Sequence, residues 1–177
     1  MIQRINTVIS VVYFYRSIRK LFVVDWRGAA WFMAMLAQNS SGMKSFQTKI
    51  IRVLIVDDQE FIRKALRRLL EIQPSFNVCG EARDGIEAVQ KAFELKPQVI
   101  VMDINMPNLD GLEATRRIRN ELSDVEVLIF TQYELLQASQ AAENAGARGC
   151  VSKSEAAREL VPALKTVCEH RPYFPTV

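Results

Sequence analysis

The sequence from residue 50 onward predicts an α/β domain built on a doubly wound parallel sheet with helices on both faces. Two observations lead to this prediction. Short apolar runs, typical of strands buried on both faces, alternate with segments whose apolar residues recur at helical spacing. Five such runs are each followed by a helical segment, which is the pattern of parallel strands joined by crossover helices.

The five predicted strands are short and almost continuously apolar. The first, Ile50–Val56, is interrupted only by Arg52. The others are expected at 76–82, 98–103, 125–131 and 148–152. Because crossover connections are right-handed, few strand orders are available, and we expect the flavodoxin-like order 2-1-3-4-5. In that order a ligand site lies beyond the carboxyl ends of the first and third strands.

The first predicted helix, 59–72, has an apolar face and a basic face. The apolar face contains Ile62, Ala65, Leu66 and Leu69. The basic face contains Arg63, Lys64, Arg67 and Arg68. This spacing is typical of a helix that packs on a core with one side and meets solvent with the other.

Acidic pairs mark the starts of the next two helices. Asp84 with Glu87, and Asp110 with Glu113, have the three-residue spacing of a capping box. Helices are therefore expected over 84–95 and 112–122.

Two more helices are expected near the end of the chain. One covers 135–145 and is ended by Gly146. The last is expected to begin near Arg158 and to reach Glu169, because this start keeps Pro162 in or just beyond the first turn, where few N–H groups have intrahelical partners.

Composition limits the classes of function. The chain has 177 residues, 49% hydrophobic and 24% charged, which predicts a packed core and excludes wholesale disorder. Residues 1–50 carry seven Lys or Arg and one Asp, so the net charge of +3 leaves −3 for the remainder. No nucleic-acid partner is therefore expected for this chain.

The cysteines, Cys79, Cys150 and Cys168, are widely spaced, and His170 is the one histidine in the sequence. This pattern argues against a zinc site or a disulfide framework.

Residues 1–48 are expected to form an N-terminal extension without an assignable fold. Its apolar runs, 5–15 and 29–37, are shorter than the roughly 18 residues needed to span a bilayer. Met43 starts a polar lead-in to the first strand, so we expect the native protein to begin there and residues 1–42 to be upstream sequence. The alternative is that residues 1–42 are genuine and tether the domain to a membrane.

Five polar residues stand at the carboxyl ends of predicted strands. Asp57 and Asp58 follow the first strand, Asp103 ends the third, Thr131 the fourth and Lys153 the fifth. The topology brings them to one sheet edge, where three carboxylates repel one another and raise each other's pKa. Mg²⁺ relieves this repulsion, because it prefers a few carboxylates, a carbonyl and waters and leaves positions for phosphate oxygens.

These residue types predict phosphoryl transfer. Asp103 would be the nucleophile that forms an aspartyl phosphate, while Lys153 and Thr131 would contact phosphoryl oxygens. Singly, the acids could be helix caps, Thr131 a strand-end residue and Lys153 a surface cation. Asp103 resists such an interpretation, because an unpaired carboxylate in an apolar strand is costly.

Four pieces of sequence carry a family resemblance: Val-Leu-Ile-Val-Asp-Asp at 53–58, Val-Met-Asp-Ile-Asn-Met-Pro-Asn-Leu-Asp-Gly at 101–111, Thr131, and Gly-Cys-Val-Ser-Lys at 149–153. Together they resemble the response-regulator receiver domain of two-component signalling. The resemblance covers about residues 49–170. It implies a cytoplasmic phosphoprotein that acts in phosphorelay signal transduction.

The resemblance also implies roles and partners. Asp58 ligates Mg²⁺ directly, Asp57 does so through water or directly, and Asn105 contributes its backbone carbonyl. The phosphoryl donor is a sensor histidine kinase or a phosphotransfer protein, for which the basic face of helix 59–72 is a docking surface. The output partner is unknown, and a phosphorylation-linked dimer is one option.

Two positions depart from the family pattern. Cys150 stands three residues before the lysine, where the family commonly has an aromatic residue that turns inward on activation. Cysteine has too little surface for that role, so we expect a weakened readout or another route at this switch position. Gln132 is larger than the small residue usual after the threonine, and we expect it to narrow access to Asp103.

Residues 171–177 are similar to the connector of NarL/FixJ-type regulators, in which a DNA-binding module follows. The chain has no such module, so we expect a stand-alone receiver or a truncated transcriptional regulator. A pseudo-receiver that binds partners without phosphorylation is a further alternative. An enzymatic phosphatase is not expected, because Asn105 cannot act as a general acid, although slow self-dephosphorylation is.

Overall fold

The computed structural model of the protein describes residues 50–175, so the expectations for residues 1–48 lie outside the described part of the chain. Within it, five parallel strands form one sheet in the order β2-β1-β3-β4-β5, as predicted. The strands are β1 (Ile51–Val56), β2 (Phe76–Ala82), β3 (Val99–Met102), β4 (Glu126–Thr131) and β5 (Gly149–Ser152).

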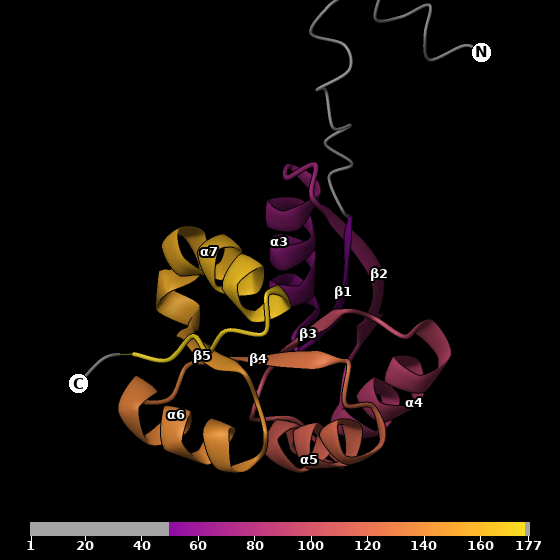
Figure 1. Ribbon diagram of the computed structural model, residues 1–177, viewed down its shortest axis with the longest axis vertical. Helices are drawn as coiled ribbons and strands as arrows, with labels where there is room; N and C mark the ends of the chain where they lie inside the picture. The colour runs from indigo at the N-terminus through magenta and orange to yellow at the C-terminus, as the bar shows by residue number, and fades with distance from the viewer. Residues whose placement is uncertain (1–49, 176–177) are drawn as a thin grey trace, which may run out of the picture. The chain divides into compact units, whose positions relative to one another are not determined.

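Helices cover both faces of this sheet (Figure 1). The helices are α3 (Glu60–Glu71), α4 (Gly85–Leu95), α5 (Gly111–Glu121), α6 (Leu135–Asn144) and α7 (Ala156–Cys168). Helices α3 and α7 lie on one face, and α4, α5 and α6 lie on the other. None of the helices in residues 50–175 is long and apolar enough to cross a membrane.

Side chains that alternate along β1 supply a core on each face of the sheet. Val53 and Ile55 pack in the core beneath α3 and α7, whereas Leu54 and Val56 pack in the core above α4, α5 and α6. Such alternation follows from the two-residue period of a strand. All four side chains are buried, which explains why the strand is continuously apolar from Val53 to Val56.

The predicted capping residues begin their helices as expected. The Glu87 N–H donates to the Asp84 carboxylate at 2.8 Å, and Glu87 accepts in return from the N–H of Arg83 at 2.9 Å. Asp110 accepts from the N–H groups of Leu112 and Glu113, both at 2.9 Å. These caps place the loops that lead into α4 and α5.

Helix α3 buries a narrower apolar face than predicted. Leu66 and Leu70 are buried, and Ile62 and Leu69 are half-buried. Ala65 is exposed, contrary to expectation, whereas Leu70, which lies outside the predicted stripe, is buried. The face that meets the core is therefore centred one position away from the predicted stripe.

The predicted start of the last helix near Arg158 is wrong. A 3-10 turn, η2 (Lys153–Glu155), leads directly into α7 at Ala156, so Pro162 lies in the interior of the helix. The proline removes one backbone hydrogen bond, whose acceptor would be the carbonyl of Arg158. Arg158 is exposed, which lets water take the place of the missing donor.

The described part of the tail extends the sheet at β5. Tyr173 forms a parallel bridge with Gly149. Its N–H donates to the Arg148 carbonyl and its carbonyl accepts from the Cys150 N–H, both at 2.9 Å. Phe174 packs against the core on the α6 side. The tail thus covers a strand edge that would otherwise expose unpaired backbone groups.

Candidate functional site

The three predicted acids meet at one edge of the sheet. Carboxylate oxygens of Asp57, Asp58 and Asp103 lie within 4.8 Å of one another. Strand pairing causes this, since β1 and β3 are neighbours and the N–H of Asp103 donates to the Val56 carbonyl at 2.9 Å. Residues that directly follow Val56 and Met102 therefore arrive at the same place.

Lys153 bridges two of these acids. Its Nζ lies 2.7 Å from Oδ2 of Asp57 and donates to Oδ2 of Asp103 at 2.8 Å. The ammonium also stands 5.9 Å from the centre of the Phe130 ring, within the range of a cation–π contact. Lys153 directly follows β5, and the Ser152 hydroxyl caps the turn that it begins. The residue that directly follows the fifth strand thus places its ammonium group beside the acids, as predicted.

The two acids after β1 have different environments. Asp57 is buried, with Oδ1 accepting from the N–H of Gln59 at 3.0 Å. Its Oδ2 is close to Lys153, yet it receives no hydrogen bond of good geometry. Asp58 is exposed, and within residues 50–175 its carboxylate has no hydrogen bond or ion pair. Asp58 is consequently the acid most available to an incoming cation.

Burial dominates the electrostatics of Asp103. It raises the pKa of this carboxyl above its ordinary value, and the nearby Asp57 carboxylate adds to the rise, while Lys153 offsets only part of it. For Lys153, burial disfavours the ammonium, but the close contacts with the carboxylates of Asp103 and Asp57 outweigh burial and its pKa rises. Lys153 therefore stays charged, and a further positive group near Asp103 would favour its ionised form.

Thr131 ends β4, the strand next to β3, and is buried. Its hydroxyl accepts from the N–H of Tyr133 at 3.2 Å. Within residues 50–175 the hydroxyl makes no hydrogen bond to Asp103 or Lys153. Gln132, the neighbour expected to narrow access, is exposed. Thr131 is thus at the predicted edge of the sheet but outside the hydrogen-bonded group.

The loop after Asp103 is held close to the site by a glycine. Gly111 N–H donates to the Ile104 carbonyl at 2.9 Å, and a Cβ at Gly111 would stand 1.8 Å from the Asp103 carbonyl oxygen. Only glycine allows this approach. Asn105 is exposed, and within residues 50–175 no group donates to its backbone carbonyl. That carbonyl is free to act as the ligand expected of it.

Cys150 is a buried core residue on β5. Its side chain packs with the core that α6 covers, and burial raises the pKa of its thiol to about 11. The thiol is therefore protonated at neutral pH. The structure does not test whether Cys150 weakens the readout of phosphorylation, so that expectation stays a prediction.

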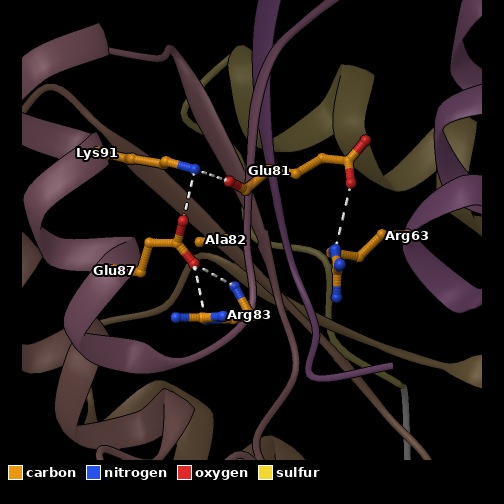
Figure 2. Close-up of a pocket in the computed structure, with 6 residues that line it drawn as sticks. All are labelled: Arg63, Glu81, Ala82, Arg83, Glu87 and Lys91. Carbon is orange, nitrogen blue, oxygen red and sulfur yellow. Dashed lines mark hydrogen bonds and ion pairs between the residues drawn. The ribbon is translucent and has the colours of Figure 1, made fainter. Parts of the chain in front are cut away.

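Sequence reasoning missed the role of Arg63 and Glu81. We expected Arg63 and Arg67 on an open docking face, but both guanidinium groups bind Glu81 on β2, with Nε to oxygen distances of 3.2 and 2.6 Å. Figure 2 shows Arg63 directed at Glu81 beside a cavity of about 250 Å³. Its lining residues are Arg63, Glu81, Ala82, Arg83, Glu87 and Lys91. The sequence signal that could have indicated this pairing is Glu81, an acid within a predicted strand, since a half-buried carboxylate favours a basic partner.

A model of the response regulator receiver domain matches residues 53–165. The chain belongs to this family. Its fold, with the order 2-1-3-4-5 and an acidic cluster at the β1–β3 edge, is that of a receiver domain in two-component signalling.

Three relatives of this receiver domain illustrate the match. Transcriptional regulatory protein LiaR of Bacillus subtilis is 40% identical over 123 residues, which cover 70% of this chain and 58% of LiaR. A protein-glutamate methylesterase/protein-glutamine glutaminase of Thermotoga maritima is 56% identical over 86 residues, covering 49% of this chain and 25% of that protein. The crystal structure of a LuxR-family response regulator from Aurantimonas superposes with a TM-score of 0.68 at 37% identity, covering 71% of this chain and 89% of that one. The receiver therefore spans about three fifths or less of these curated relatives.

Proposed function

We propose that this receiver accepts a phosphoryl group on Asp103, with Mg²⁺ bound by the acids around it. The single observation that carries the proposal is that Lys153 joins Asp57 and Asp103 at 2.7 and 2.8 Å in a cluster that includes Asp58. Structural pairing alone needs one acid for one lysine. A third carboxylate in this cluster is better explained by a divalent cation.

The residues present fit Mg²⁺ as a hard cation with oxygen ligands. Asp58 and Asp103 would hold it through their carboxylates, and Asn105 through its backbone carbonyl. Asp57 would act through water, because its Oδ1 is engaged by Gln59 and its Oδ2 faces Lys153. When bound, the ion neutralises charge on the phosphoryl oxygens and on the acids.

The proposed reaction is transfer from a phosphohistidine. A carboxylate oxygen of Asp103 attacks the phosphorus, the P–N bond breaks as the P–O bond forms, and the departing imidazole nitrogen keeps the electron pair and gains a proton. We propose that the Lys153 ammonium leaves the Asp103 carboxylate after phosphorylation and contacts a phosphoryl oxygen instead. Thr131, at the end of the adjacent strand, is the proposed hydroxyl donor to another phosphoryl oxygen.

The donor proposed for this reaction is a sensor histidine kinase or a phosphotransfer protein, which the chain meets in the cytoplasm. Phosphorylation would shift the population of conformations of the β4–α6–β5 face, which binds an unidentified output partner or a second copy of the chain. The name of LiaR concerns transcriptional regulation, so a truncated transcriptional regulator stays an alternative for this chain. We propose no nucleic-acid partner for the chain. We also propose that Cys150 weakens the coupling between phosphorylation and the change in this face.

We propose no dedicated substrate turnover beyond slow self-dephosphorylation. The methylesterase relative is matched over 25% of its length, so we do not carry the activity in its name over to this chain. Asn105 also lacks the acidity that protonation of a leaving group needs. A non-phosphorylated interaction module is the competing proposal.

The test uses acetyl phosphate as a small phosphoryl donor and intact-mass spectrometry as the readout. The wild type is expected to gain one phosphoryl group in Mg²⁺ and none in excess EDTA. Asp103→Asn is expected to gain none in either buffer, whereas Asp124→Asn, a change at an exposed acid, is expected to match the wild type. Absence of any gain by the wild type would favour the interaction module.

A further inference from the structure

The loop that carries Asp57 and Asp58 has few internal supports. Strand β1 ends at Val56, so the carbonyls of the next two residues have no partner in the sheet. Helix α3 begins directly afterwards, and its N-cap Gln59 makes no side-chain capping bond. Asp57 is buried, and the carbonyl of a buried residue needs a hydrogen-bond donor, so this loop gains from a donor outside the sheet.

Arg63 is that donor. Its Nη1 donates to the Asp57 carbonyl at 2.8 Å and, at a longer 3.3 Å, to the Asp58 carbonyl. Side chains on a helix lie over the turn toward its N-terminus, which lets a residue in the first turn of α3 reach back to this loop. The Arg63 side chain is only 15% exposed, so water replaces these bonds poorly.

Glu81 fixes the other side of the same guanidinium. Its Oε2 accepts from Nε of Arg63 at 3.2 Å, while Oε1 accepts from Arg67 at 2.6 Å. Burial alone would raise the pKa of Glu81, but the bonds from Arg67 and Arg63 outweigh it and the pKa falls. Strand β2 therefore holds Arg63 against β1 through a charged carboxylate, as Figure 2 shows for the Arg63–Glu81 pair.

We propose that Arg63 is a positioning residue for the cation site: it clamps the backbone of Asp57 and Asp58, and Glu81 orients it. The inference rests on the proposed function, because it assumes that these acids bind Mg²⁺. The clamp sets the peptide planes from which both carboxylates project. Without it, the loop relaxes and the acids lose their preset geometry.

Charge and positioning make opposite predictions for loss of Arg63. Removing a positive charge beside three carboxylates strengthens attraction for a cation on Coulombic grounds. Removing the clamp weakens binding, because groups that orient metal ligands typically contribute about 10- to 100-fold in affinity. The sign of the change therefore separates the two effects.

The test is an isothermal titration of the full chain with Mg²⁺ alone. Arg63→Met is expected to bind about tenfold more weakly than the wild type, the lower end for such orienting groups. Arg68→Met removes the same charge from an exposed position of the same helix and is expected to bind unchanged or slightly more tightly. Arg63→Lys, which reaches one carbonyl but not Glu81 as well, is expected to recover part of the affinity.

Amide NMR reports the local conformation of the folded protein, which a loss of stability alone does not change. Shifts of the Asp58 and Gln59 N–H signals in folded Arg63→Met, without metal, are expected to differ from those of the wild type. Wild-type affinity in Arg63→Met, or an equal loss in Arg68→Met, overturns the inference and leaves the proposed function intact. If Arg63→Met does not fold, Glu81→Gln and Arg63→Lys are titrated in its place. Wild-type affinity for Mg²⁺ in both of these variants overturns the inference. A wild type that binds no Mg²⁺ overturns both.

Discussion

Lys153 and Asp103, 50 positions apart in sequence, are joined by a hydrogen bond of 2.8 Å between Nζ and Oδ2. The bond closes the gap between the ends of β5 and β3, although β4 separates these strands in the sheet. Burial still raises the pKa of Asp103, because Lys153, which also contacts Asp57, offsets only part of the effect of burial. Additional positive charge beside Asp103 would therefore favour its ionised form.

Asp103→Asn is expected to stabilise the metal-free protein at neutral pH. The raised pKa means that the folded environment disfavours the ionised carboxylate, and asparagine has no charge to bury. Urea unfolding in EDTA measures the free energy of unfolding. Mg²⁺ is expected to stabilise the wild type more than the variant, since it binds the folded state of the wild type better.

The control is Asp124→Asn, which changes an exposed acid and is expected to leave stability unchanged. A lower free energy of unfolding for Asp103→Asn than for the wild type in EDTA would contradict the account. It would mean that the pairing with Lys153 outweighs burial.

Glu126→Gln is expected to destabilise the protein by about 1–3 kcal/mol at neutral pH, the usual loss for a buried charged partner. Glu126 is buried at the start of β4 and contacts Arg119, Arg148 and His170. Burial would raise its pKa, but these hydrogen bonds and charges outweigh burial and the pKa falls.

The effect of Glu126→Gln has a definite pH dependence. A lowered folded pKa contributes stability that is present above the ordinary value of 4.5 and is lost as pH falls through the folded pKa. The difference between variant and wild type should therefore shrink in that acidic range. Thermal melts across pH, with exposed Glu121→Gln as the control, measure it. A difference that grows on acidification is incompatible with this assignment.

Gly111→Ala is expected to destabilise the protein by about 1–3 kcal/mol, as overpacking does. It should also reduce phosphoryl acceptance, because the new Cβ would stand 1.8 Å from the Asp103 carbonyl oxygen. Gly80→Ala is the matched control, since its Cβ meets the flexible ends of Leu95 and Leu54. Denaturant unfolding and acetyl phosphate labelling should show a larger loss of stability and of phosphoryl acceptance for Gly111→Ala than for Gly80→Ala. Equal losses would rule out a role for the contact between Gly111 and the Asp103 carbonyl.

Cys150 is expected to resist alkylation in the native protein. The residue is 2% exposed and its pKa is raised to about 11, so little reactive thiolate is present. Peptide mass spectrometry after iodoacetamide treatment should find Cys150 unmodified in buffer and modified in urea. Half-buried Cys79 serves as the internal comparison. Modification of Cys150 at the same rate in both solvents would show that β5 opens readily.

The sheet order and the acid site could be predicted because both depend on local rules. Buried parallel strands are continuously apolar, and residues that follow neighbouring strands meet at one edge. Asp57, Asp103 and Lys153 each directly follow such a strand, so no side-chain detail was needed to place them together. The caps at Asp84 and Asp110 followed from a three-residue spacing in the same way.

Other features depend on tertiary contacts that sequence spacing does not reveal. The basic stripe of α3 suggested an open surface, but Arg63 binds acceptors in the loop after β1 and on β2. Pro162 suggested a later helix start, yet it lies inside α7, where the hydrogen bond that it removes would reach the carbonyl of the exposed residue Arg158. Pairing of Tyr173 with β5 rests on backbone groups and has no side-chain signature.

Reductive trapping tests the central claim most directly. The full chain is incubated with acetyl phosphate and Mg²⁺, the acyl phosphate is reduced with borohydride, and peptides are sequenced by mass spectrometry. An aspartyl phosphate yields homoserine at its own position, and the account predicts homoserine at residue 103. Homoserine at 57, 58 or another acid, or none at all in the folded wild type, would contradict it.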